Sequence, residues 1–412
     1  MSKEISFLHA ADLHLDSPFK GLAHMPASIF EQVRESTFAA LDRLINMAIE
    51  TQVDFLLIVG DLFDNEKQSL KAQIRLRTAF EELERHHINV YLSYGNHDYT
   101  KGNRHPVTYP DNVFIFPDEK VRHFIHSKDG QKIAEIHGFS YENRAVLTNK
   151  TAEYQVVDKT IPYHIAMLHG SVQGNTEHDT YAPFQLSELM TSSYDYWALG
   201  HIHKQEILKE DPSIVYPGNI QGRHRNETGE KGCVHVVLSE NQQTVDFIPL
   251  QSIVFTRLML DVSACEEIHQ LERMIQHKLT TDSSASPQLI DLILVSKQEQ
   301  LNQWENDGDL QEIIDLINET TIQSSQWSYI FRHSLQVEVE SSKQRLEQGD
   351  HFISELARQV EEGTIYDMTE ELFKHRQARK YVDMISEQEG MAIKSEARDL
   401  LMNELLHSRK RR

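Results

Sequence analysis

The sequence predicts an α/β fold in which two β-sheets are flanked by helices. In the first hundred residues, short apolar strands alternate with segments of helical periodicity, which is the pattern of βαβ units. After residue 121 the pattern changes to hairpins, which indicates a second, partly antiparallel sheet. Of the 412 residues, 39% are hydrophobic. This fraction is enough for a globular core and excludes a wholly disordered chain.

The expected elements follow from hydrophobic periodicity and turn chemistry. Strands are short apolar runs, and helices carry apolar residues at spacings of three and four. In chain order the first elements are a strand at 5–10, a helix at 28–50, a strand at 55–59, a helix at 69–85 and a strand at 90–93. Later strands are expected at 121–126, 132–138, 163–168, 195–199, 232–238 and 244–249. The turn sequence Ser-Lys-Asp-Gly at 127–130 joins the first two of these as a hairpin.

A second unit is predicted from about residue 252. Residues 252–339 contain a strand–helix–strand–helix–strand pattern and no catalytic motif, so we expect a small α/β domain beside a first domain at 1–251. Residues 340–412 show helical periodicity throughout. Their apolar face has the spacing of a helix that binds a groove or a coiled coil, and is formed by Ile393, Ala397, Leu400, Leu401 and Leu405. The alternative is a helix folded back on its own domain.

The charge of the chain is strongly negative and unevenly distributed. With 41 Lys+Arg and 63 Asp+Glu, the formal net charge is −22. Residues 340–412 hold 15 acidic and 13 basic residues (net −2), which leaves 48 and 28 (net −20) for residues 1–339. This charge opposes nonspecific capture of nucleic acid, so such a substrate would need metal ions or a partner to supply positive charge. We expect a cytoplasmic protein without a membrane segment, because neither a signal peptide nor an 18-residue apolar run is apparent.

Five loops that follow predicted strands carry side chains suited to metal ions. Taken singly, each loop has the composition of an ordinary turn; five in order, each closing an apolar run, indicate one site at the carboxyl ends of the strands. Carboxylate, amide and imidazole groups together suit Mn²⁺, Fe²⁺ or Zn²⁺, and a pair of such ions about 3.5–4 Å apart shares a bridging carboxylate. The candidate ligands are Asp12, His14, Asp61, Asn96, His169, His201 and His203.

The order of these blocks resembles the calcineurin-like metallophosphoesterases. It reads D-x-H, G-D-x-x-D, G-N-H-D, H and G-H-x-H between residues 9 and 203. Residues 9–16 (HAADLHLD) and 60–63 (GDLF) are similar to the SbcD-type DNA-repair exonucleases, and most similar to their YhaO branch. The resemblance implies a phosphoesterase (nuclease) core built as a three- or four-layer α/β/β/α sandwich, a small α/β capping domain at 252–339 and a helical C-terminal tail.

The resemblance also implies a distribution of roles among the candidate ligands. Mn²⁺ is the expected metal, with Fe²⁺ or Zn²⁺ as alternatives, and Asp61 would bridge two ions. One ion would be held by Asp12, His14 and His203, and the other by Asn96, His169 and His201.

Two residues beside the ligands are implied to act in catalysis. In the family, the residue matching His97 faces the scissile phosphate, where it stabilises the transition state or protonates the leaving oxygen. Asp98 is expected to fix the tautomer of His97 and to raise its pKa.

Three further residues are candidates for substrate binding. Asp64 stands where SbcD-type nucleases commonly carry a histidine that helps to position DNA. Arg223 and His224 follow the last ligand block, where they could contact a substrate phosphate; the alternative is a structural turn with surface charges. Four histidines on predicted strands are interpreted as core or surface residues: His123, His126, His137 and His164.

The expected function is two-metal hydrolysis of phosphodiesters. By resemblance, the protein would be a DNA exonuclease or endonuclease subunit in DNA repair, working with an SbcC-like coiled-coil ATPase that docks on residues 340–412, and possibly as a homodimer. A stand-alone phosphodiesterase for nucleotides or RNA is the alternative, which the acidic body and Asp64 support. A structural subunit with a residual metal site is a third.

Overall fold

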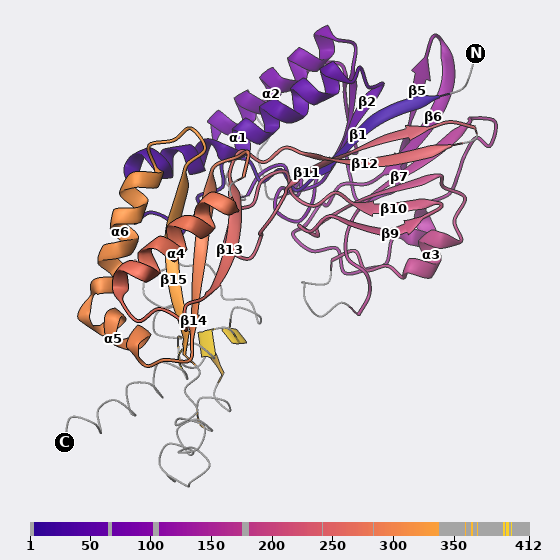
Figure 1. Ribbon diagram of the computed structural model, residues 1–412. Helices are drawn as coiled ribbons and strands as arrows, with labels where there is room; N and C mark the ends of the chain where they lie inside the picture. Colours follow the sequence, from indigo (N-terminus) through magenta and orange to yellow (C-terminus); the bar gives the residue numbers. More distant parts are fainter. Residues whose placement is uncertain are drawn as a thin grey trace. The chain divides into compact units, whose positions relative to one another are not determined.

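The structure is a computed structural model. The chain folds into two compact units. The structure describes residues 4–64, 68–101, 107–174, 181–240, 242–282 and 284–337, with isolated positions between 359 and 397. One unit is formed by Met1–Pro18 and Ala27–Thr256, and the other by Phe19–Pro26 and Arg257–Arg412 (Figure 1). The predicted docking segment at 340–412 lies outside the described residues except for those isolated positions, which include Ile393 and Ala397 but not Leu400, Leu401 or Leu405.

The first sheet of unit one is largely parallel. Its strands lie in the order β12-β11-β1-β2-β3-β4. β1 to β4 pair in parallel, as the βαβ pattern predicted, while β11 and β12 add an antiparallel hairpin. The strands are β1 (Ile5–Ala11), β2 (Phe55–Val59), β3 (Asn89–Ser93), β4 (Val113–Ile115), β11 (Gly232–Leu238) and β12 (Gln243–Pro249).

The second sheet of this unit is mixed. Its strands lie in the order β5-β6-β7-β8-β10-β9, with a parallel centre and antiparallel edge strands. The strands are β5 (Arg122–Lys128), β6 (Gln131–Gly138), β7 (Tyr163–His169), β8 (Tyr196–Gly200), β9 (Glu206–Glu210) and β10 (Ser213–Tyr216).

The two sheets share a core, and helices cover the outer face of the first. Alternate residues of a strand face opposite sides, so Phe7 and Phe55 pack between the sheets while Leu8 and Leu56 pack under the helices. The helices are α1 (Ala27–Glu50) and α2 (Leu70–Arg85). The outer face of the second sheet is covered by loops together with η1 (Thr151–Glu153) and α3 (Leu186–Met190). The predicted α/β/β/α sandwich is confirmed, with a thin outer helical layer.

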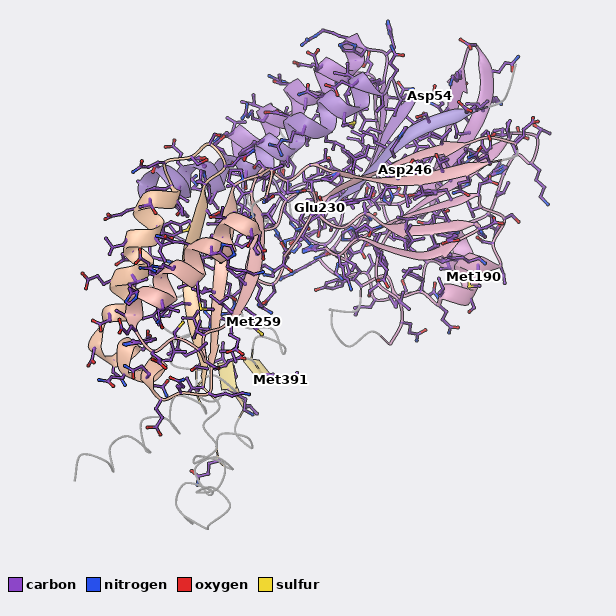
Figure 2. All side chains as sticks on the ribbon, in the orientation of Figure 1. Asp54, Met190, Glu230, Asp246, Met259 and Met391 are labelled. Carbon is purple, nitrogen blue, oxygen red and sulfur yellow. The ribbon has the colours of Figure 1, made fainter. Side chains whose placement is uncertain are left out.

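Strand register brings the polar loops to one edge of the sandwich. The last residues of β1, β2 and β3 are neighbours, because Ala11 pairs with Val59 and Val59 with Ser93. In the second sheet His169 pairs with Gly200 at the ends of β7 and β8. The other end of β2 has a structural role: Asp54 accepts the Ser6 amide at 2.9 Å and pairs with Lys128 (Figure 2).

Unit two is a small α/β body. Its sheet has the order β13-β14-β15, and its helices cover a core that includes Leu292 and Ile314. The segment 19–26 belongs to this unit, where the His24 ring donates to the Phe331 carbonyl at 3.2 Å. Its elements are β13 (Val254–Asp261), which begins in unit one, α4 (Ile268–Thr281), β14 (Gln288–Ser296), α5 (Gln300–Asp307), α6 (Asp309–Thr321) and β15 (Ser328–Val337). Within the described parts of both units, no helix is long and apolar enough to cross a bilayer.

Candidate metal centre

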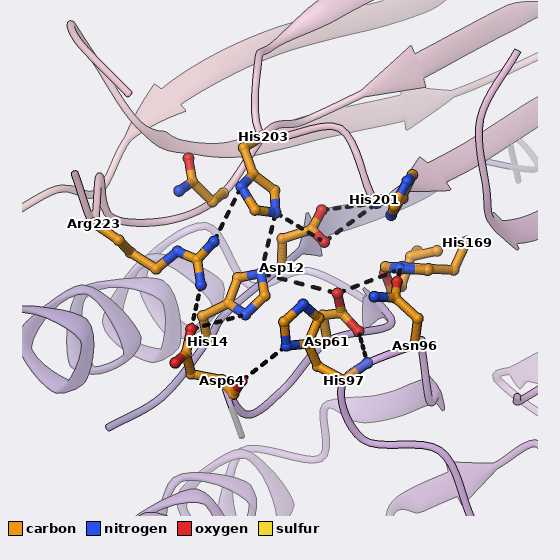
Figure 3. A network of polar contacts seen from close by, with 12 residues as sticks. Asp12, His14, Asp61, Asp64, Asn96, His97, His169, His201, His203 and Arg223 are labelled. Atoms are coloured by element: carbon orange, nitrogen blue, oxygen red, sulfur yellow. Dashed lines mark hydrogen bonds and ion pairs between the residues drawn. The ribbon is translucent and has the colours of Figure 1, made fainter. Parts of the chain in front are cut away.

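The loops after β1, β2, β3, β7 and β8 converge on one buried cluster of polar side chains (Figure 3). The structure brings all the predicted ligands together there. Three overlapping groups offer ligand atoms that lie within 4.8 Å of one another: Asp12, His14 and His203; Asp12, Asp61 and His169; and His14, Asp61 and His97.

On one side of the cluster two imidazoles face each other. Nε2 of His14 lies 3.1 Å from Nε2 of His203 and 3.9 Å from Oδ2 of Asp61. Nε2 of His203 lies 3.8 Å from Oδ1 of Asp12. Nδ1 of His203 donates to Glu227 at 2.7 Å, so in the neutral ring Nε2 carries a lone pair that points into the cluster.

On the other side of the cluster, a hydrogen bond to the backbone of Val59 orients the His169 ring. Its Nδ1 donates to the Val59 carbonyl at 3.0 Å, which leaves Nε2 directed at Oδ1 of Asn96, 3.0 Å away, and Oδ2 of Asp61, 3.5 Å away. The His201 ring lies 5.4 Å from the His169 ring.

The backbone around the cluster is strained. Asp12, Asp61 and His201 have φ angles of 52°, 51° and 94°, in the left-handed region that costs side chains about 1–3 kcal/mol. Gly60 and Gly200 allow the close packing: a Cβ at Gly60 would lie 2.2 Å from Nδ1 of His169, and one at Gly200 would lie 2.2 Å from the Val59 carbonyl oxygen. Such strain persists only where the surrounding structure imposes it, which is typical of functional sites.

The electrostatics of the cluster fit bound cations. Asp12 and Asp61 are each only 1% exposed. Burial, assisted by the charge of Asp61, raises the pKa of Asp12 to about 8. Burial also lowers the pKa of His14 well below its usual value, and Nδ1 of this ring has no hydrogen-bond partner among the described residues. Adjacent buried carboxylates and a neutral imidazole with one unpartnered nitrogen are a donor set that divalent metal ions complete.

The structure corrects the expectation for Asp98. Its Oδ1 accepts the Gly95 amide and its Oδ2 accepts the Leu62 amide, both at 2.7 Å. Nδ1 of His97 donates instead to the Asp64 carbonyl at 2.8 Å. The prediction that Asp98 fixes the tautomer of His97 is therefore wrong; Asp98 ties together the loops after β2 and β3.

Asp98→Ala is expected to destabilise the fold. The substitution leaves two backbone amides without their acceptor, and each unsatisfied buried amide costs about 1–3 kcal/mol. Urea unfolding of metal-free protein measures the change, with the exposed Asp246→Ala as the matched control. An unfolding free energy equal to that of the wild type would contradict the bracing role.

Glu227 is a site residue that the sequence analysis missed. It is 7% exposed, and besides the His203 ring it accepts Nδ2 of Asn219 at 2.9 Å and the Arg223 amide at 2.7 Å. Burial opposes its ionisation, but Arg223 and His203 hold its pKa well below the usual value. A carboxylate on the far nitrogen of a metal-binding imidazole fixes the ring and makes it a better ligand. Glu227 lies in a loop without a motif, so no sequence signal pointed to it.

Glu227→Ala is expected to weaken metal binding about 10–100-fold, the usual effect of losing such a partner. Glu227→Gln keeps an oxygen that accepts from His203 and should lose less. Calorimetric titration with Mn²⁺ measures both, and the exposed Glu230→Ala is the control (Figure 2). Unchanged affinity in Glu227→Ala, in a protein with wild-type circular dichroism, would refute the positioning role.

The candidate substrate-binding residues lie at the rim of the cluster. Arg223 forms an ion pair with Asp64, and its other terminal nitrogen lies 3.6 Å from Oε1 of Glu227. Both members of the pair are mostly buried. The His224 side chain is 50% exposed, with Nε2 3.3 Å from Oε1 of Glu227. Contact of these residues with a phosphate stays a prediction.

Residues 5–205 match the model of the calcineurin-like phosphoesterase family. This match, together with 36% identity to a metallophosphoesterase over 98% of the chain, shows that the chain belongs to that family. The prediction of a calcineurin-like metallophosphoesterase is confirmed, and the protein is a metal-dependent phosphoesterase.

Individual relatives refine the comparison. The chain is 36% identical over 407 residues to an uncharacterized metallophosphoesterase, YhaO of Bacillus subtilis strain 168, across 98% of this chain and 99% of that protein. It is 24% identical over 234 residues to the DNA double-strand break repair protein Mre11 of Methanocaldococcus jannaschii, across 54% of this chain and 58% of that protein. Among solved structures, it is similar to a dimetal phosphatase from Danio rerio, with a TM-score of 0.36 and 12% identity over 60% of this chain and 96% of that chain.

Proposed function

We propose that this protein hydrolyses phosphodiester bonds in DNA with two divalent metal ions, Mn²⁺ in the first place and Fe²⁺ or Zn²⁺ as alternatives. The observation that carries the proposal is the convergence of loops from both sheets on one buried set of carboxylate, amide and imidazole groups. When bound, such ions act as Lewis acids on the phosphoryl group and lower the pKa of water. One ion would be held by Asp12, His14 and His203, the other by Asn96, His169 and His201, and both by Asp61.

His97 is the proposed catalytic side chain. Its Nδ1 donates to the Asp64 carbonyl and its amide donates to Oδ1 of Asp61 at 2.9 Å, so both ring and backbone are fixed beside the bridging carboxylate. We propose that Nε2 faces the substrate. Because Nδ1 already carries a proton, Nε2 carries one as well only in the imidazolium form, which would donate it to the departing oxygen.

DNA is the proposed substrate, for two reasons. The residues around Asp12 and Asp61 resemble those of SbcD-type nucleases, and a relative over 54% of the chain is named as a DNA double-strand break repair protein. Because the net charge of −22 repels a polyanion, we propose that an SbcC-like coiled-coil ATPase, docked on residues 340–412, supplies the positive surface.

A stand-alone phosphodiesterase for nucleotides or RNA is the second candidate. The observation that favours it is the ion pair between Asp64 and Arg223. It puts a carboxylate at the rim of the cluster and occupies the cation that would otherwise meet an extended phosphate backbone. A nucleotide has no extended backbone and would not need that cation, so within this candidate the ion pair favours nucleotides over RNA.

A Mn²⁺-dependent assay on linear duplex DNA, single-stranded DNA, RNA and bis-p-nitrophenyl phosphate separates the candidates. Cleavage of DNA, strengthened by the ATPase, is the expected result. Turnover of RNA or the small diester without any DNA cleavage would favour the second candidate. Protein that binds two metal ions but turns over none of these substrates would overturn both.

A further inference from the structure

A second cluster of ionisable side chains lies on the outer face of the second sheet, where β5, β6 and β7 run side by side (Figure 1). In the register of these strands, His123 is opposite His137, and Glu135 is opposite His164. Glu135 and His137 are two residues apart on β6, so they share a face. The register therefore gathers these four side chains on one patch of sheet.

Three of the four are spaced for a shared cation. Oε1 of Glu135 lies 3.8 Å from Nε2 of His123 and 3.9 Å from Nε2 of His137, and the three residues offer ligand atoms within 4.8 Å of one another. These separations are too long for hydrogen bonds. Two ligands at about 2.0–2.1 Å from a tetrahedral Zn²⁺ lie about 3.3 Å apart, so small side-chain shifts complete the site.

The polar atoms that face this position are buried and lack partners. Glu135 is 0% exposed and His137 is 2% exposed. Among the described residues, neither Oε1 of Glu135 nor Nε2 of His137 has a hydrogen-bond partner. The backbone of Gln155 is close enough to the His137 ring to raise its pKa by hydrogen bonding. Leaving such atoms unsatisfied costs about 1–3 kcal/mol each, and few occur in native proteins.

The surroundings hold the carboxylate in a ligand orientation. Its Oε2 accepts the amides of Val157 and Asp158, both at 3.3 Å, and lies 3.6 Å from Nε2 of His164, which directs Oε1 at the two imidazoles. Burial lowers the pKa of His137 to about 4, so its ring is neutral, the form that binds metals. The His123 side chain is 37% exposed and gives access from solvent.

We propose that His123, Glu135 and His137 bind one divalent transition-metal ion, of which Zn²⁺ fits best. Two imidazoles and one carboxylate, with the fourth position left to water, are a ligand set that zinc uses. The site is separate from the phosphoesterase centre, because His164 precedes His169 by five residues on β7, about 16 Å along a strand. The ion would fasten the edge strand β5 to β6 and so stabilise the exposed edge of the sheet.

Zinc counting tests the proposal. After dialysis against Zn²⁺ and gel filtration, elemental analysis should find one zinc fewer in His123→Ala than in the wild type, and one fewer in Asp61→Ala/His123→Ala than in Asp61→Ala. The matched control is His269→Ala, which removes a similarly exposed histidine from unit two and should leave the count unchanged. Equal counts with and without His123 overturn the proposal.

A stability measurement adds an independent readout. His137→Phe keeps an aromatic ring, although a larger one, and removes both ring nitrogens, so the melting temperature of each protein is compared with that of its own metal-free form. In the Asp61→Ala background, Zn²⁺ should raise the Tm while His137 is present and leave it unchanged in His137→Phe. A zinc-dependent rise that persists in His137→Phe, or no rise with His137 present, contradicts the site. If His137→Phe fails to fold, the count with His123→Ala still decides.

Discussion

Asp61→Ala is expected to abolish metal binding and hydrolysis together. Asp61 is central to the cluster: its carboxylate lies 3.5 Å from Nε2 of His169 and 3.9 Å from Nε2 of His14, and it accepts the His97 amide at 2.9 Å. Losing a single electrostatic stabiliser costs about 10²–10³ in rate. Losing the group that we propose to be shared by both metal positions should cost more, because the ions themselves would leave.

Elemental analysis and bis-p-nitrophenyl phosphate turnover measure the effect of Asp61→Ala. Asp246→Ala, an aspartate exposed on β12, is the control and should match the wild type in both (Figure 2). If two ions are retained at the centre in Asp61→Ala, Asp61 does not bridge them. Retained ions with lost activity would instead give it a purely catalytic role.

His97→Ala is expected to separate binding from catalysis. The variant should keep both ions and its substrate affinity, while kcat falls by about 10²–10⁴, the contribution of a general acid. The reason is geometric: the ring is held by the Asp64 carbonyl, and the backbone amide that binds Asp61 survives the substitution.

Metal content, kcat and KM are the quantities to measure in His97→Ala, with the exposed His86→Ala at the end of α2 as control. A ligand atom of His97 lies within 4.8 Å of ligand atoms of both His14 and Asp61, so His97 is close enough to be a metal ligand itself. Loss of one ion in His97→Ala would make the residue a ligand and would require another proton donor.

The position of the candidate metal centre was predictable because it depends only on the order of the strands and of the loops that follow them. Apolar runs ending before Asp12, Asp61 and Asn96 put these residues at one edge of a parallel sheet, whatever the details of packing. The contacts made within that edge were not predictable. Asp98 is next to His97 in sequence yet binds the amides of Leu62 and Gly95, because the tight loop turns its carboxylate away from the ring.

The cluster on β5 and β6 shows a different limit. The hairpin and its turn were expected, and counting back from the pair Lys128–Gln131 would set His123 opposite Ile136, on the face between the sheets. A bulge between His126 and Ser127 shifts the register by one residue and sets His123 opposite His137 instead. A one-residue shift moves a side chain to the other face, and bulges have no reliable sequence signature.

The close contact between Gly200 and Val59 affects where the two sheets of the sandwich separate first on heating. At this point the two sheets meet backbone to backbone, with no room for a Cβ, while elsewhere large side chains such as Phe7 and Phe55 separate them. Cations bound across the same edge would clamp it further. Thermal opening should therefore begin at the opposite edge, near Asp54 and Lys128, and spread toward the clamp. Amide hydrogen exchange should then be slowest at the carboxyl ends of β1, β2, β7 and β8, and removing metal should speed it there first.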